Sequence, residues 1–73
     1  MRDFQIDGWK VGDIVSGHRA DYVIQRIINH PERPDWALAF VTRPKGRKIY
    51  LALFVQTKQG RWVMADEPVP LPG

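Results

Sequence analysis

The sequence contains no cysteine, which excludes disulfide bonds, thiolate metal sites and cysteine nucleophiles together. Candidate catalytic groups are otherwise few, since Ser16 is the only serine and His18 and His30 are the only histidines. A triad of Ser16, His18 and Asp21 can be drawn, but residues so close on one strand and turn rarely meet as nucleophile, base and orienting acid. We therefore predict a protein that is not an enzyme and has no cofactor and no metal.

Long apolar runs are also missing. No stretch approaches the roughly 18 apolar residues that a membrane-spanning helix requires, and the first residues contain no apolar run of signal-peptide length. The absence of cysteine is compatible with a reducing compartment. We expect a cytoplasmic protein that has no contact with a membrane.

The chain of 73 residues has room for one small domain, whose stability margin should be thin because a short chain buries a small fraction of its surface. Its hydrophobic content of 44% is enough for a globular core. We predict one domain over residues 1–73, with loosely ordered ends at 1–8 and at 66–73, where prolines alternate. A monomer is expected, and self-association through an exposed strand edge is the alternative.

Acidic residues are absent from the segment 36–65, which carries six of the eleven Lys and Arg side chains. The flanking segments hold all eight Asp and Glu residues, so the net charge of +3 is unevenly distributed along the chain. A field of one sign attracts anionic partners and steers their approach. The charge pattern therefore favours an anionic neighbour over a catalytic role.

Short segments rich in β-branched and aromatic residues, separated by turn residues, predict strands within 9–18, 21–30, 36–42, 47–57 and 61–65. Helices over 21–29 and 47–58 are the alternatives, because neither range contains a glycine or proline. The fold class expected is mainly β: a small antiparallel meander of four or five strands, forming an SH3-like barrel or a curled sheet.

Alternation along the predicted strands assigns side chains to faces. In 47–57 one face carries Ile49, Leu51, Leu53 and Val55, and we interpret this face as structural. Trp36, within an alternating strand, is expected in the core. Trp9 precedes the first strand and is expected to be partly exposed.

Candidate contact residues gather at two predicted turns. The contacts predicted for a partner or for nucleic acid are Arg43, Lys45, Arg47, Lys48, Lys58, Arg61 and Trp9. Tyr50, Phe54 and Trp62 are placed to interleave with them, as aromatic residues do on platforms for single-stranded nucleic acid. The alternative is a solvated face, because Lys and Arg are common at turns and at sheet edges.

Two resemblances bear on function. The stretch "WKVGDIV" resembles the opening strand of SH3-like small barrels, a fold that binds RNA, DNA, peptides and protein tails. In length, basic charge and lack of cysteine the chain is similar to small phage-encoded regulators, such as those of Xanthomonas phages, that bind the RNA polymerase of the bacterial host. This resemblance implies docking on an RNA polymerase subunit, with inhibition of transcription initiation or antitermination as the effect. The alternative is a nucleic-acid-binding small β-barrel that uses a basic stripe over residues 43–62.

Overall fold

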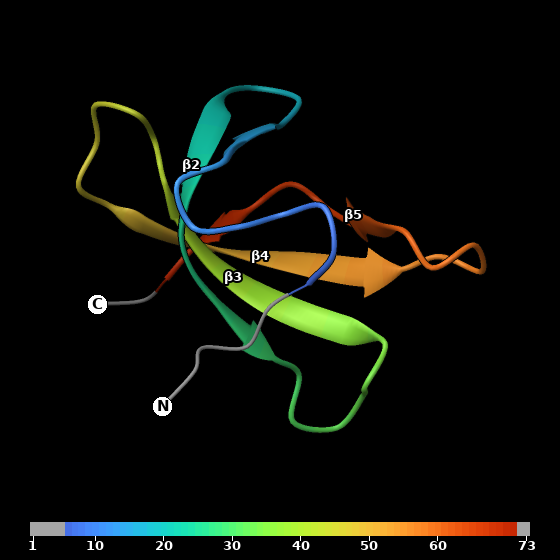
Figure 1. Cartoon of the computed structure of the whole chain (residues 1–73). Coiled ribbons are helices and arrows are strands. Elements are labelled where there is room, and N and C mark those ends of the chain that lie inside the picture. The colour runs from blue at the N-terminus through green and yellow to red at the C-terminus, as the bar shows by residue number, and fades with distance from the viewer. Residues whose placement is uncertain (1–5, 72–73) are drawn as a thin grey trace.

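The computed structural model describes residues 6–71, and within them the chain is all-β with no helix. Its strands are β1 (Ile14–Ser16), β2 (Asp21–Asn29), β3 (Trp36–Thr42), β4 (Ile49–Gln56), β5 (Trp62–Met64) and β6 (Val69–Pro70). The first five form an antiparallel meander (Figure 1). Strand β6 pairs with the first half of β4, on the same edge that pairs with β5 farther along the strand. The sheet curls into a half-barrel. The predicted mainly-β meander is confirmed in its curled-sheet form, and the helices considered for 21–29 and 47–58 are wrong.

A β-bulge in β2 explains why the alternation of that strand is ambiguous in the sequence. The register shifts between Ile24, opposite Val41, and Arg26, opposite Phe40, so that Gln25 is an extra residue. Such a bulge reverses the alternation and bends the strand. As a result Ile24 and Ile27 both face the interior and are buried, although an unbroken strand would place them on opposite faces.

The face of β4 that lines the interior of the half-barrel is the one with Ala52 and Phe54, opposite to the face predicted to be structural. Ala52 and Phe54 are buried, whereas Ile49 on the other face is 46% exposed and Leu51 and Leu53 are only half-buried. The interpretation of the Ile49–Val55 face as the structural one is therefore wrong. The inner face of β4 combines the small Ala52 with the large, fully buried Phe54, so side-chain size along this strand does not mark the buried face.

Strand β3 also has one buried face and one outer face. Ala37, Ala39 and Val41 are buried in the interior, whereas Trp36 is half-buried on the outer face. The expectation that Trp36 lies in the core is wrong. Its ring lies under the guanidinium of Arg33, whose Cζ is 4.3 Å from the ring centroid, and is edge-on to His30.

The N-terminal segment fills the open side of the half-barrel. Ile6 is buried in the core, and the half-buried Trp9 packs edge-on against Phe54 with the ring centroids 5.4 Å apart. Gly8 and Gly12, which flank residues 9–11 of this segment, have φ angles of +88° and +97°. This left-handed backbone favours glycine, because other residues meet steric strain there.

The C-terminal segment continues along the edge of β4. Val69 lies opposite Leu51 and Pro70 opposite Tyr50, and Pro68 is buried. Between β5 and β6 the chain bends at Asp66. In the ends predicted to be loosely ordered, residues 6–8 belong to the N-terminal segment that fills the half-barrel, and residues 66–71 lead into and include β6. Residues 1–5 and 72–73 lie outside the described residues.

Candidate binding surfaces

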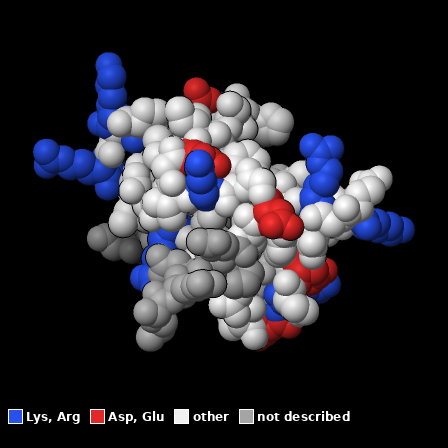
Figure 2. Space-filling model, in the orientation of Figure 1, with Lys and Arg blue, Asp and Glu red and all other residues white. Residues whose placement is uncertain are grey.

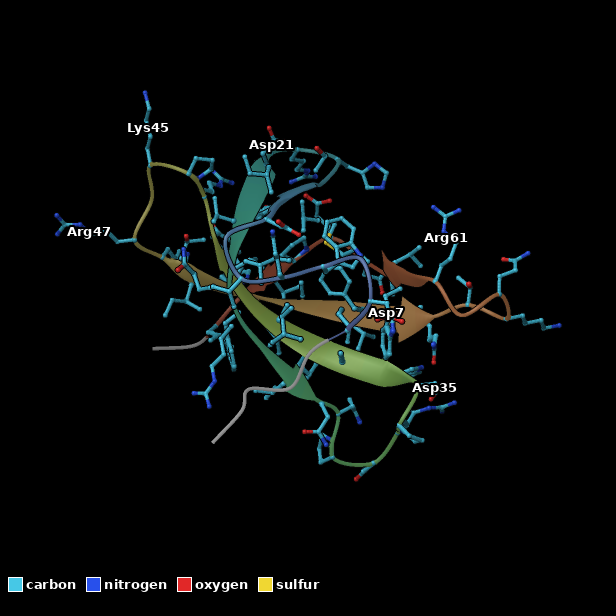
Figure 3. All side chains as sticks on the ribbon, in the orientation of Figure 1. Asp7, Asp21, Asp35, Lys45, Arg47 and Arg61 are labelled. Atoms are coloured by element: carbon cyan, nitrogen blue, oxygen red, sulfur yellow. The ribbon has the colours of Figure 1, made fainter. Side chains whose placement is uncertain are left out.

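The predicted cationic residues lie in two exposed turns. Arg43, Lys45, Arg47 and Lys48 are in the β3–β4 loop (residues 43–48), and Lys58 and Arg61 are at the β4–β5 turn (residues 57–61). All six are exposed. Figure 3 shows Lys45 and Arg47 pointing away from one side of the molecule and Arg61 pointing away from the opposite side.

These two turns do not form a continuous basic stripe. The eight residues of β4 separate them, and at ~3.4 Å per residue the strand spans roughly 24 Å. Figure 2 shows the projecting Lys and Arg side chains as separate groups at opposite ends of the molecule. The segment 43–62, which is uniformly basic in the sequence, therefore becomes two basic ends in the structure.

Between the two basic ends lies an apolar surface on the outside of the sheet. The register places Leu38 opposite Leu53 and Phe40 opposite Leu51. We call this surface the outer apolar face, and it comprises the half-buried residues Trp36, Leu38, Phe40, Leu51, Leu53 and Val55. The exposed Val63 and Val69 extend it onto β5 and β6. A large contiguous apolar patch on a protein surface is a candidate interaction site.

The aromatic residues expected to interleave with the cations have different surroundings. Phe54 has no exposed surface and is unable to contact a partner. Trp62 is half-buried against the core, and Tyr50 is half-buried beside the β3–β4 loop. Among these three aromatic residues, Tyr50 is the one with predicted cations over its ring, with Arg43 Cζ 5.7 Å and Lys48 Nζ 5.8 Å from the ring centroid.

Trp9, the aromatic contact predicted for a partner, is tied to the domain by its indole. Its Nε1 donates a hydrogen bond to the Trp62 carbonyl oxygen at 2.8 Å. This bond connects the N-terminal segment to β5, far away in the sequence. The indole N–H is therefore already satisfied within the chain.

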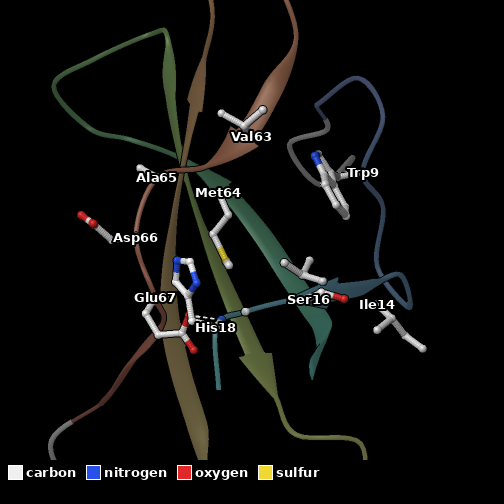
Figure 4. Close-up of a pocket in the computed structure, with 11 residues that line it drawn as sticks. Trp9, Ile14, Ser16, His18, Val63, Met64, Ala65, Asp66 and Glu67 are labelled. Carbon is white, nitrogen blue, oxygen red and sulfur yellow. Dashed lines mark hydrogen bonds between the residues drawn. The ribbon is translucent and has the colours of Figure 1, made fainter. Parts of the chain in front are cut away.

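A groove of about 660 Å³ runs between the open edges of β1 and β5 (Figure 4). Val15 and Met64 contribute apolar side chains to it, while His18 and Glu67 lie at one end. The bond from Trp9 to Trp62 joins the two sides of the half-barrel in the same region. Glu67 makes a second connection, since its carboxylate accepts from the backbone N–H of His18 (2.6 Å) and of Arg19 (3.4 Å).

The Glu67 contact has an electrostatic consequence. The hydrogen bond from the His18 backbone, supported by that from Arg19, holds the pKa of Glu67 below its ordinary value. Gly17 makes the approach possible, because a Cβ at this position would lie 2.7 Å from Glu67 Oε2. The turn between β1 and β2 is therefore shaped to receive this carboxylate.

Replacing Glu67 by glutamine is expected to lower stability at neutral pH and to reduce its loss in acid. Because the pKa is lower in the folded state, the carboxylate stabilises the fold above its unfolded-state pKa, and this stabilisation disappears as the pH falls through the folded-state value. Thermal midpoints measured between about pH 7 and about pH 3 should therefore converge for the wild type and Glu67→Gln at the acid end.

Two further variants complete this experiment. Gly17→Ala should displace the carboxylate and reproduce the pH profile of Glu67→Gln. Asp66→Asn removes the neighbouring carboxylate, which is exposed and accepts no hydrogen bond from the described residues, and should keep the wild-type profile. Parallel profiles of Glu67→Gln and the wild type over the whole range would contradict the assignment.

The described residues contain no group of three His, Cys, Asp or Glu side chains that would hold a metal ion. Likewise, no helix suited in length and hydropathy to crossing a membrane occurs in residues 6–71.

The exposed ion pair of Arg33 and Asp35, at 3.7 Å, contributes little to stability in water.

Two features of these surfaces are not visible in the amino-acid sequence. Arg19 lies in a segment with mixed charges, yet the fold brings it to the same end as Arg43. The exposure of the outer apolar face is the second, because alternation shows that residues share a face without showing which face is covered. Comparison of the chain with protein-family models, with curated proteins and with solved structures gives no match.

Proposed function

We propose that this chain is a small, non-enzymatic binding module that docks on bacterial RNA polymerase, in the cytoplasm, through its outer apolar face. The observation that carries the proposal is the order of surfaces along β4: cations at one end, an apolar face in the middle and cations at the other end. An apolar centre with a charged rim is the usual anatomy of a protein–protein interface. The choice of polymerase rests on the resemblance to small phage-encoded regulators.

The charges specify the partner surface that would be complementary. The segment 36–65 contributes cations and no carboxylate to this side of the domain. A matching partner has an apolar patch with carboxylates at both ends, separated by the span of β4. The apolar contact would supply affinity, and the cations would orient the module and accelerate its association. Occupation of such a surface on the polymerase would alter initiation or termination of transcription.

The first test is binding to purified bacterial RNA polymerase, measured by biolayer interferometry. The wild-type chain is expected to bind, and Lys45→Ser/Arg47→Ser should lower the association rate by about 3- to 10-fold at low salt, because both side chains project from one basic end. Raising the salt concentration should narrow this difference, since exposed charges are screened.

The matched control is Lys10→Ser, which removes an exposed cation from the turn before β1. Apart from the small decrease that follows from removing one positive charge, its association rate should equal that of the wild type. If the wild-type chain does not bind the purified enzyme, the choice of polymerase is wrong. If Lys10→Ser lowers the association rate as much per charge removed as Lys45→Ser/Arg47→Ser does, the β3–β4 loop has no special role in association.

A further inference from the structure

A recess of about 490 Å³ lies where the β1–β2 turn meets the β3–β4 loop. Its lining includes Arg19, Tyr22, Arg43, Tyr50 and Pro70, and we call it the tyrosine recess. These residues come from β2, β4, β6 and both turns, so only the folded sheet brings them together. The volume is within the range of small-molecule sites and suits a single nucleotide.

The guanidinium groups of Arg19 and Arg43 form no salt bridge within the described residues. The ion pair between Arg33 and Asp35 is the only one within residues 6–71, so neither Arg19 nor Arg43 is paired with a carboxylate there. Glu67 also lines the recess and attracts Arg19 electrostatically, but its carboxylate accepts hydrogen bonds from the backbone N–H groups of His18 and Arg19 and forms no salt bridge with the Arg19 guanidinium. The two guanidinium groups therefore remain available to an anion.

The aromatic part of the recess lies beside these charges. Tyr22 and Tyr50 meet edge-on with their ring centroids 5.4 Å apart, and Arg43 and Lys48 approach the Tyr50 ring. Tyr22 is almost completely buried, while Tyr50 is half-buried and retains exposed surface. Guanidinium groups match the geometry of phosphate oxygens, and an exposed ring offers a stacking surface for a base.

We propose that the tyrosine recess binds one nucleotide of a single-stranded nucleic acid, with Arg19 and Arg43 on the phosphate and the Tyr50 ring against the base. Single strands fit this arrangement because their bases are free to leave the stack, whereas the bases of a duplex are paired. The inference does not depend on docking to RNA polymerase. It also differs from a basic stripe over residues 43–62, because only one end of β4 takes part.

The experiment titrates the full chain against a fluorescein-labelled ten-nucleotide oligo(dT) and measures fluorescence anisotropy. The variant Arg19→Ser/Arg43→Ser is compared with Lys58→Ser/Arg61→Ser, which removes the same charge from the opposite end. Losing the recess pair should raise Kd at least tenfold, and losing the distant pair should raise it less than twofold. Circular dichroism establishes that both variants are folded.

Further arms separate a specific site from general attraction. Arg43→Lys keeps the charge but lacks the planar fork, and should bind more weakly than the wild type. Competition with inorganic phosphate tests whether the phosphate group alone is sufficient for binding. Because the proposed site also contacts the base, unlabelled oligo(dT) should displace the labelled strand at far lower concentration than inorganic phosphate does. If the wild type does not bind, or if the Kd ratio between the two double variants is below fivefold, the proposal is overturned.

Discussion

Replacing Phe54 by alanine is expected to leave the domain largely unfolded at room temperature. Phe54 has no exposed surface, is among the largest fully buried side chains and packs against Trp9. Truncating a buried phenylalanine to alanine costs about 3–5 kcal/mol, through lost transfer free energy and the cavity that remains. A domain this small has about that much stability in total.

Leu53→Ala is the matched control, because Leu53 precedes Phe54 in β4 and faces the opposite side of the sheet. It is only half-buried, so its loss should cost about 1 kcal/mol and leave the chain folded. Urea unfolding followed by circular dichroism measures both variants. Equal destabilisation by the two substitutions would mean that the interior has been assigned to the wrong face.

Replacing Leu38 and Leu53 together by threonine is expected to weaken binding to RNA polymerase by at least about 30-fold, or roughly 2 kcal/mol. The two residues are opposite each other at the centre of the outer apolar face, and residues at the centre of an interface carry most of its binding energy. Threonine is β-branched and suits a strand, so the fold should persist. Biolayer interferometry with the purified enzyme gives the affinity.

The control for this pair removes two exposed apolar residues from the region of β1. Val11 and Ile14 are 54% and 60% exposed and lie away from β3 and β4. Val11→Thr/Ile14→Thr should bind the polymerase with nearly wild-type affinity. If the Leu38/Leu53 variant stays folded and retains its affinity, the outer apolar face is not the docking surface.

The two experiments address opposite faces of the same strand. Phe54 tests what holds the half-barrel together, and Leu53 with Leu38 tests what the half-barrel presents to a partner. Because the side chains alternate along β4, neighbouring positions should separate stability from binding. A variant that loses binding while its urea midpoint is preserved identifies the outer apolar face as functional surface.

Local sequence was sufficient to predict β1 to β5 and their antiparallel order, whereas β6 lies in the tail for which no strand was predicted. Period-two alternation in 36–42 and 47–57, with turn residues such as Pro44 and Gly60 between the segments, indicated short strands joined by tight turns. These are properties of neighbouring residues, so no knowledge of distant contacts was needed. The absence of acid from 36–65 was equally visible and predicted cationic turns.

Only the tertiary structure decided which face of the sheet is inside. Both faces of β3 and β4 are apolar, so alternation sorted the residues into two sets without ranking them. The curl of the sheet decides which face is covered: Ala37, Ala52 and Phe54 lie inside it, and Leu38, Phe40 and Leu51 lie outside. The bulge at Gln25, which the sequence pattern did not reveal, places Ile24 and Ile27 on the same buried side.

The charges show the same division. The sequence by itself determined that the segment 43–62 is cationic, but the extended length of β4 separated its two turns and left an apolar surface between them. The fold also joined Arg43 to Arg19, which lies 24 positions earlier in a segment of mixed charge. Pairing of distant strands fixes such neighbours, and composition along the chain contains no record of it.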